Sequence, residues 1–61
     1  MKTDWEQLTK EQKSKYKKYC DEKFGKTIMF VEYGEPMYLD ENHNMIDTSI
    51  IIKLLFHTNN N

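Results

Sequence analysis

The stretch Lys26-Thr-Ile-Met-Phe-Val-Glu-Tyr-Gly-Glu-Pro-Met-Tyr-Leu-Asp40 decides the fold class of this chain. Its first eight residues are rich in β-branched and aromatic side chains, which favour extended strands. Gly34-Glu-Pro36 then interrupts the run with residues typical of turns, and the apolar pattern resumes at Met37. We therefore predict a β-hairpin whose strands cover residues 26–33 and 37–40.

The residues that follow extend the hairpin into a predicted meander. Glu41-Asn-His-Asn44 is a second candidate turn, because asparagine tolerates a positive φ and its side chain can mimic a backbone turn. Met45-Ile46 is then a candidate third strand. The sheet is expected to be antiparallel, with two or three strands.

Both faces of the first predicted strand are largely apolar. Successive side chains point to opposite faces of a strand. One face can lie under a helix, whereas the other needs the C-terminal segment, a second subunit or a target protein to cover it. The two faces carry Ile28, Phe30 and Glu32, and Met29, Val31 and Tyr33, respectively.

Two capping signatures open the N-terminal half of the chain. In Thr3-Asp-Trp-Glu6 a threonine stands three residues before a glutamate, so each side chain can bond the backbone N–H of the other residue. Thr9-Lys-Glu-Gln12 repeats the pattern. The sequence predicts a short turn ending near Leu8 and a helix over about 10–24, with one continuous helix as the alternative. Gly25 is placed to end the helix in a left-handed conformation.

The predicted helix is amphipathic. At 100° per residue its apolar side chains gather on one side, with Phe24 at the margin and the lysines on the flanks and back. We expect this side to pack on the sheet. It carries Trp5, Leu8, Gln12, Tyr16, Tyr19 and Cys20.

The C-terminal segment can be read in two ways. Asp47-Thr-Ser49 offers three N-caps ahead of the apolar run Ile50-Ile-Ile-Lys-Leu-Leu-Phe56, in which the isoleucines favour a strand and the leucines favour a helix. Helix is slightly preferred. The expected fold class is α+β: an N-terminal amphipathic helix packed on a two- or three-stranded antiparallel meander, with a C-terminal apolar helix or strand. Residues 1–57 would form one compact domain and 58–61 a frayed polar tail.

Length and composition restrict the classes of function. A chain of 61 residues has room for one domain and not for a deep substrate cleft. Its single cysteine favours a reducing compartment, and no apolar run is long enough for secretion or membrane insertion, so we expect a cytoplasmic protein that does not bind membranes. All nine basic residues are lysine, a bias typical of low-GC bacteria and their phages.

Charge is distributed unevenly along the chain. Residues 10–26 hold seven lysines and three acidic residues, a net charge of +4, whereas residues 27–61 hold five acidic residues and one lysine, a net charge of −4. The lysine-rich helix could form a phosphate-binding face with stacking tyrosines, which predicts a nucleic-acid-binding accessory protein as the alternative function. The absence of arginine and the acidic second half disfavour that reading.

One local pattern is similar to a known family. Residues 5–19 contain Trp5, Leu8, Thr9 and Lys13 followed by Tyr16, Lys17, Lys18 and Tyr19. This pattern resembles the stretch of an HMG box that joins its first helix to its second, and the resemblance implies minor-groove DNA binding with bending. The resemblance extends no further, since only four residues precede the pattern where an HMG box has a full helix, and the sequence that follows is strand-like.

No spacing in the sequence predicts an active site or a metal centre. His43 and His57 lie far apart, and neither Ser14 nor Ser49 has a neighbouring histidine and acid at a recognisable spacing. Cys20 has lysines one turn away but lies on the aromatic side of the helix, which favours a core role. We expect a protein without catalytic activity, metal or cofactor.

Binding of a partner through the protein surface remains as the predicted basis of function. Eight aromatic residues and four methionines are many for so small an interior, and such side chains are enriched at interface centres. We expect a phage or low-GC bacterial regulator or inhibitor that occupies a surface of a larger host protein, with lysines steering it to an acidic surface. Self-association is a third possibility. The candidate contacts are Trp5, Lys13, Tyr16, Lys17, Lys18, Tyr33 and Tyr38.

Overall fold

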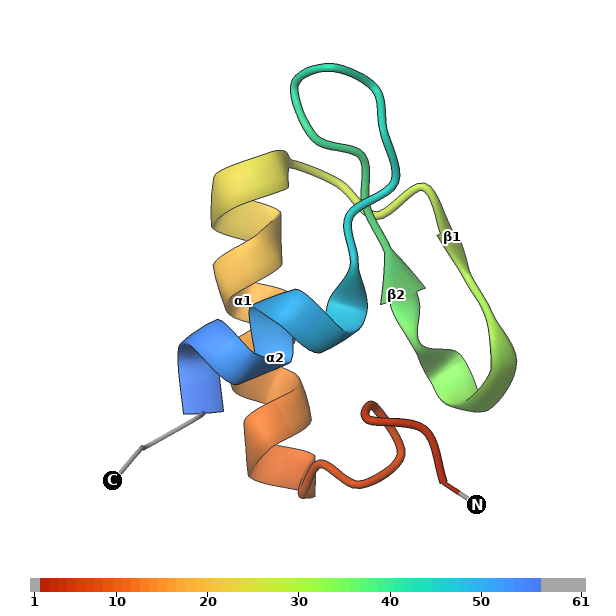
Figure 1. The fold of residues 1–61 in the computed structure, drawn as a ribbon, viewed down its shortest axis with the longest axis vertical. Coiled ribbons are helices and arrows are strands. Elements are labelled where there is room, and N and C mark those ends of the chain that lie inside the picture. Colours follow the sequence, from red (N-terminus) through yellow and green to blue (C-terminus); the bar gives the residue numbers. More distant parts are fainter. Residues whose placement is uncertain (1, 57–61) are drawn as a thin grey trace.

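The computed structural model describes residues 2–56, which form two helices and a small sheet (Figure 1). The order is α1 (Lys10–Phe24), β1 (Met29–Phe30), a 3-10 turn η1 (Glu32–Gly34), β2 (Pro36–Met37) and α2 (Thr48–Phe56). In Figure 1, α2 crosses α1, and the hairpin lies on the other side of the molecule from α1. The α+β class is confirmed. The predicted tail, 58–61, lies outside the described residues, as does His57.

Both predicted capping boxes form. The backbone N–H of Glu6 donates to Thr3 Oγ1 at 3.2 Å, and Glu6 Oε1 accepts from the N–H of Thr3 at 2.8 Å. The corresponding bonds between Thr9 and Gln12 measure 3.1 and 2.9 Å. Each box satisfies backbone donors that a helix start leaves free. The chain therefore makes a separate turn before α1 begins at Lys10, as the sequence predicted.

Gly25 ends α1, and its backbone requires glycine. Its N–H donates to the carbonyl of Asp21 at 3.1 Å, and its φ of 89° lies where side chains are rarely tolerated. Its ψ of −149° differs from that of the predicted left-handed helical conformation. A Cβ atom here would meet no other atom within 4 Å, so the backbone angle and not crowding selects glycine.

The hairpin forms with much shorter strands than predicted. Antiparallel pairing joins Met29 to Met37 and Phe30 to Pro36. Residues 32–34 form η1 and do not continue the first strand, because the chain turns at positive φ there. Pro36, predicted as part of the turn, begins β2, a position that tolerates a residue without an N–H.

The predicted third strand is reduced to a single bridge. Leu39 pairs with Met45, and the intervening turn is held by Asp40, whose Oδ1 accepts the backbone N–H groups of Asn42 and Asn44 at 2.8 and 2.9 Å. The expectation that an asparagine takes the positive φ is wrong, since His43 does, at 66°. The backbone N–H groups of Asn42 and Asn44 donate to the Asp40 carboxylate instead.

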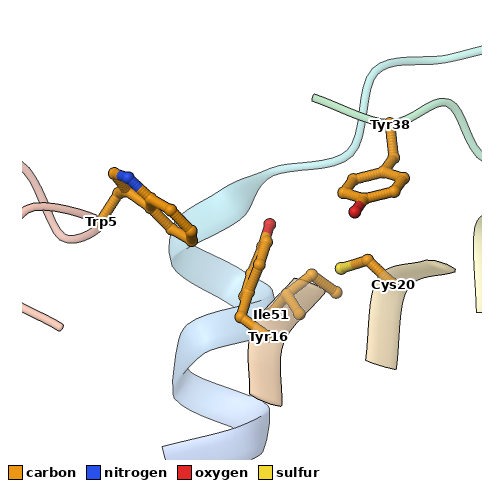
Figure 2. Packing of buried hydrophobic residues seen from close by; sticks show 5 residues of the cluster. All are labelled: Trp5, Tyr16, Cys20, Tyr38 and Ile51. Carbon is orange, nitrogen blue, oxygen red and sulfur yellow. The ribbon is translucent and has the colours of Figure 1, made fainter. Parts of the chain in front are cut away.

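The core lies between α1, α2 and the segment after β2. Its buried members are Trp5, Tyr16, Cys20, Tyr38 and Ile51, drawn in Figure 2. The expectation that one face of the first strand lies under the helix is wrong, because α1 packs on Tyr38 and α2 while residues 28–31 stay exposed. Tyr38 fills the space that the first strand was expected to fill.

The segment that the sequence left as helix or strand is the helix α2. Asp47 precedes it, and its Oδ1 accepts the N–H of Ser49 at 3.0 Å while its carbonyl accepts from Ile50 and Ile51. Ile51 is buried, whereas Ile50 and Leu54 are 57% and 69% exposed. Helix α2 thus buries one side and leaves an apolar stripe on the other.

Candidate protein-interaction surface

A run of apolar side chains on the hairpin is exposed to solvent. Their exposed fractions range from 39% for Val31 to 68% for Tyr33. Figure 1 shows β1 on the side of β2 that faces away from α1. Because successive side chains of a strand alternate between its faces, the hairpin is apolar on both sides, and exposed apolar residues in this number are typical of sites that bind other proteins. We call Ile28, Met29, Phe30, Val31 and Tyr33 the hairpin surface.

Hydrogen bonds hold the backbone of the hairpin surface in place. The N–H of Ile28 donates to the carbonyl of Met37 at 2.8 Å, and the N–H of Val31 donates to that of Glu35 at 2.9 Å. The Thr27 hydroxyl also lies 2.7 Å from the Met37 carbonyl. The apolar side chains therefore project from a structured hairpin and not from a free loop.

Trp5 attaches the turn of the hairpin to the core. Its indole N–H donates to the carbonyl of Tyr33 at 3.0 Å, and its ring meets the edge of Tyr16 with 5.5 Å between ring centroids. Lys13 Nζ lies 5.4 Å from the same indole ring, within the range of a cation–π interaction. On the other side of the turn, the Thr48 hydroxyl donates to Glu35 Oε2 at 2.6 Å. Two contacts from distant parts of the sequence thus fix this turn.

Tyr33 has a left-handed backbone conformation, which favours glycine over tyrosine. Its φ of 63° and ψ of 20° are left-handed, which costs a residue with a side chain about 1–2 kcal/mol. Its side chain is 68% exposed and buries little surface in return. Glycine would adopt this backbone without the cost. The stability of the fold therefore does not explain why tyrosine stands here.

Two carboxylates belong to the turn of the hairpin. Glu32 is exposed within the turn, and Glu35 ends it half-buried. We call this pair the acidic rim. Negative charge thus stands next to Val31 and Tyr33 of the hairpin surface.

The structure brings four of the seven predicted contact residues together around one indole ring, because Lys13, Tyr16 and the backbone of Tyr33 all contact Trp5. Two others share a partner: the Tyr38 hydroxyl donates to Asp21 Oδ1 at 2.8 Å, and Lys17 Nζ lies 3.0 Å from Asp21 Oδ2. Lys18 is exposed elsewhere on α1. The sequence did not predict this division.

Burial corrects three of the predicted contacts. Tyr16 and Tyr38 are fully buried and Trp5 is 5% exposed, so these side chains form the core and have no surface to offer a partner. Their aromatic character fits a core and an interface equally well, and the small interior needed them. Of the predicted aromatic contacts, Tyr33 is the exposed one.

Four members of the hairpin surface were not among the predicted contacts: Ile28, Met29, Phe30 and Val31. The sequence did carry the signal, because a strand that is apolar on both faces exposes one of them unless two layers cover it. In this fold neither face is covered.

Burial shifts the pKa of titratable groups in the core, and hydrogen bonds shift the pKa of a carboxyl that contacts them. Burial raises the pKa of the Cys20 thiol, which makes it a poor nucleophile. Burial also raises the pKa of Tyr38, and the bond to Asp21 adds to that effect. The same bond, with the Lys17 contact, lowers the pKa of the Asp21 carboxyl. Among residues 2–56, no group of three histidine, cysteine or acidic side chains is placed to hold a metal ion.

The exposed face of α1 carries mixed charge. Lys17 and Asp21 form an ion pair, and Glu11 and Glu22 stand four residues from Lys15 and Lys18 on the same exposed side. Such interleaving is typical of a solvated helix, and the acidic side chains would repel phosphate. An open depression of about 380 Å³ near the end of this helix is lined by Lys17, Asp21, Gly25, Lys26 and Thr27.

Comparison with known proteins finds no family model, no curated protein and no solved structure that matches this chain. The resemblance to an HMG box ends at Tyr19, because a β-hairpin follows α1. Within residues 2–56, neither α1 nor α2 has the length and the apolar character that a membrane span requires.

Proposed function

We propose that this chain is a non-enzymatic protein-binding module that occupies a surface of a larger protein through the hairpin surface. The observation that carries the proposal is Tyr33, an exposed aromatic side chain held in a left-handed backbone where glycine would be more stable. A residue kept at a cost to folding is best explained by a contact made outside the fold.

Size supports the same proposal. A standard protein interface covers about 800 Å² on each partner, whereas this molecule exposes 4722 Å² in total. One face is therefore large enough to bind a partner, although the chain has little room to enclose a substrate. Occupying that much of a larger protein would regulate or inhibit it, and a buried, free Cys20 fits a reducing compartment such as the cytoplasm.

Lysines of α1 would act at longer range. Lys17 and Lys18 are exposed on α1. We propose that they affect the rate of association with a partner whose outer surface is acidic, and that they do not contact the site that the hairpin surface fills. Their removal should slow binding at low salt and leave the rate of dissociation unchanged.

The test is affinity capture with matched variants. Tagged wild-type protein is expected to retain one protein in stoichiometric amount from a lysate of its own cell. Tyr33→Gly should lose that protein while folding at least as stably, because glycine suits the backbone. Phe30→Ser should lose it too, with a free energy of unfolding within about 0.5 kcal/mol of wild type.

Leu54→Ser is the control, since Leu54 on α2 is 69% exposed, close to the 68% of Tyr33. It should capture the same protein as wild type. Equal capture by Tyr33→Gly and wild type, or loss of capture with Leu54→Ser alone, would contradict the proposed role of the hairpin. Turnover of a small substrate by the purified monomer would contradict the non-enzymatic assignment.

A further inference from the structure

We infer that the site filled by the hairpin surface is an apolar groove bordered by lysine or arginine side chains. The inference rests on the proposed function and adds the chemistry of the partner. It combines two observations on one region: the exposed apolar side chains of the hairpin surface and the acidic residues around its turn.

The acidic rim consists of Glu32 and Glu35. Glu32 is exposed between Val31 and Tyr33, and Glu35 is half-buried with its Oε2 accepting from the Thr48 hydroxyl. Lys13 is half-buried against the Trp5 ring, and the exposed Lys26 precedes the first strand, at the end of the hairpin opposite the turn. A partner that presents acidic residues here would meet like charge, whereas a basic rim would meet opposite charge.

A second copy of this chain fits the surface poorly. A symmetric dimer brings the same patch of each molecule together. The exposed Glu32 carboxylates and their neighbours would then crowd into one interface, and like charges that face each other oppose association. Nucleic acid is disfavoured for the same reason, since its phosphates are negative.

Docking through side chains also fits better than addition of a strand. Strand addition needs a row of free backbone groups along an edge. β1 is two residues long, and the chain turns into η1 directly after Val31. The hairpin therefore presents apolar side chains on both of its faces, which suits insertion into a groove, with Tyr33 at the end nearest the acidic rim.

The test uses two synthetic peptides as probes of a basic or an acidic amphipathic surface. Both are helical 15-residue peptides with one leucine pattern, and their polar positions are all lysine or all glutamate. The isotope-labelled full-length protein is titrated with each peptide and followed by NMR. The lysine peptide should shift the amide signals of residues 28–35 with a Kd at least about tenfold below that of the glutamate peptide.

A charge reversal sharpens the test. Glu32→Lys should weaken binding of the lysine peptide several-fold and strengthen binding of the glutamate peptide. Glu22→Lys makes the same change of charge on the exposed face of α1 and serves as the control, which should leave the ratio of the two affinities unchanged. Tyr33→Gly should lower affinity for the lysine peptide about tenfold.

Four results would overturn the inference. The first is equal affinity of both peptides for residues 28–35, which would leave an apolar docking surface without charge selection. The second is a shift of signals on α1 in place of the hairpin. The third is dimerisation in sedimentation experiments that Phe30→Ser abolishes, which would make a second copy the occupant. If neither peptide binds but capture still depends on Tyr33, the inference fails while the proposed function stands.

Discussion

At the scale of single residues, the Tyr16 hydroxyl is the buried side-chain polar atom within residues 2–56 that makes no hydrogen bond. Thr48 and Cys20 lie close to it, but neither makes a hydrogen bond with it, and the Thr48 hydroxyl donates to Glu35. A buried hydroxyl without a partner costs about 1–3 kcal/mol. The ring of Tyr16 therefore stabilises the core, while its oxygen atom weakens it.

Replacing Tyr16 by phenylalanine removes that oxygen and keeps the ring. We expect Tyr16→Phe to leave the free energy of unfolding unchanged or to raise it by about 1 kcal/mol. Tyr16→Ala removes the ring and should lower it by about 3–5 kcal/mol. Urea unfolding of both variants measures the two effects. A loss of more than about 1 kcal/mol in Tyr16→Phe would show that the hydroxyl has a partner in solution.

The same residue predicts how stability depends on alkaline pH. Burial raises the pKa of Tyr16 from 10.0 to about 12, so the folded state keeps a proton that the unfolded state releases. Its contribution to stability is complete below pH 10 and is lost as the pH rises from 10 to about 12. Between pH 9 and 12, the urea midpoint of unfolding should fall less steeply with rising pH in Tyr16→Phe than in wild type. Parallel curves would exclude Tyr16 as a source of that dependence.

At the scale of elements, α1 depends on the capping interactions at its two ends more than on the helix propensity of its residues. Thr9 and Gln12 satisfy each other's backbone donors at the N-terminus, and Gly25 ends the helix at a positive φ. Between these ends the helix buries two side chains, Tyr16 and Cys20. A helix with so narrow a buried stripe depends strongly on its caps.

Loss of the Thr9 cap should destabilise the whole domain. Thr9→Ala leaves the N–H of Gln12 without its acceptor, and we expect the free energy of unfolding to fall by about 1 kcal/mol. Ser14→Ala serves as a control because Ser14 is exposed in the middle of α1, and alanine there should raise stability by a few tenths of a kcal/mol. Thermal unfolding followed by circular dichroism measures both. The two substitutions should change the stability in opposite directions; a change in the same direction would contradict the role of the cap.

At the scale of the whole molecule, contacts between distant segments decide the shape of the hairpin. Trp5 and Tyr33 are 28 positions apart, and the bond between them joins the N-terminal turn to the turn of the hairpin. The bond between Thr48 and Glu35 joins that turn to α2. The hairpin surface is therefore positioned by both ends of the described chain and not by β pairing alone.

Breaking the Trp5 contact should loosen the hairpin before it unfolds the protein. Trp5→Phe keeps an aromatic ring against Tyr16 but removes the donor to the Tyr33 carbonyl. We expect a loss of about 1–2 kcal/mol in unfolding free energy and faster amide hydrogen exchange at Gly34 and Glu35. Tyr19→Phe, which loses a hydroxyl on half-buried Tyr19, should leave that exchange unchanged. Unaltered exchange in Trp5→Phe would show that β pairing holds the turn without Trp5.

Local chemistry was readable in the sequence. Both capping boxes, the start of α1 at Lys10 and the hairpin itself followed from residues close together in the chain, because caps and turns depend on neighbouring side chains. The division between core and surface was readable in part: the helix side with Trp5, Tyr16 and Cys20 is buried, as predicted, but the places of the tyrosines of the hairpin region were not predicted. Tyr16, Tyr33 and Tyr38 have the same chemical character, and two of them are buried while the third is exposed.

The α+β class, the caps and the asymmetry of charge were thus predictable from the sequence. Tertiary contacts decide that Tyr38 and α2 cover α1, that the first strand stays uncovered, and that Trp5 and Thr48 hold one turn. The physical reason is that a small interior has space for few large side chains. Which of them occupy it depends on contacts between segments far apart in the chain, and these contacts leave no local pattern in the sequence.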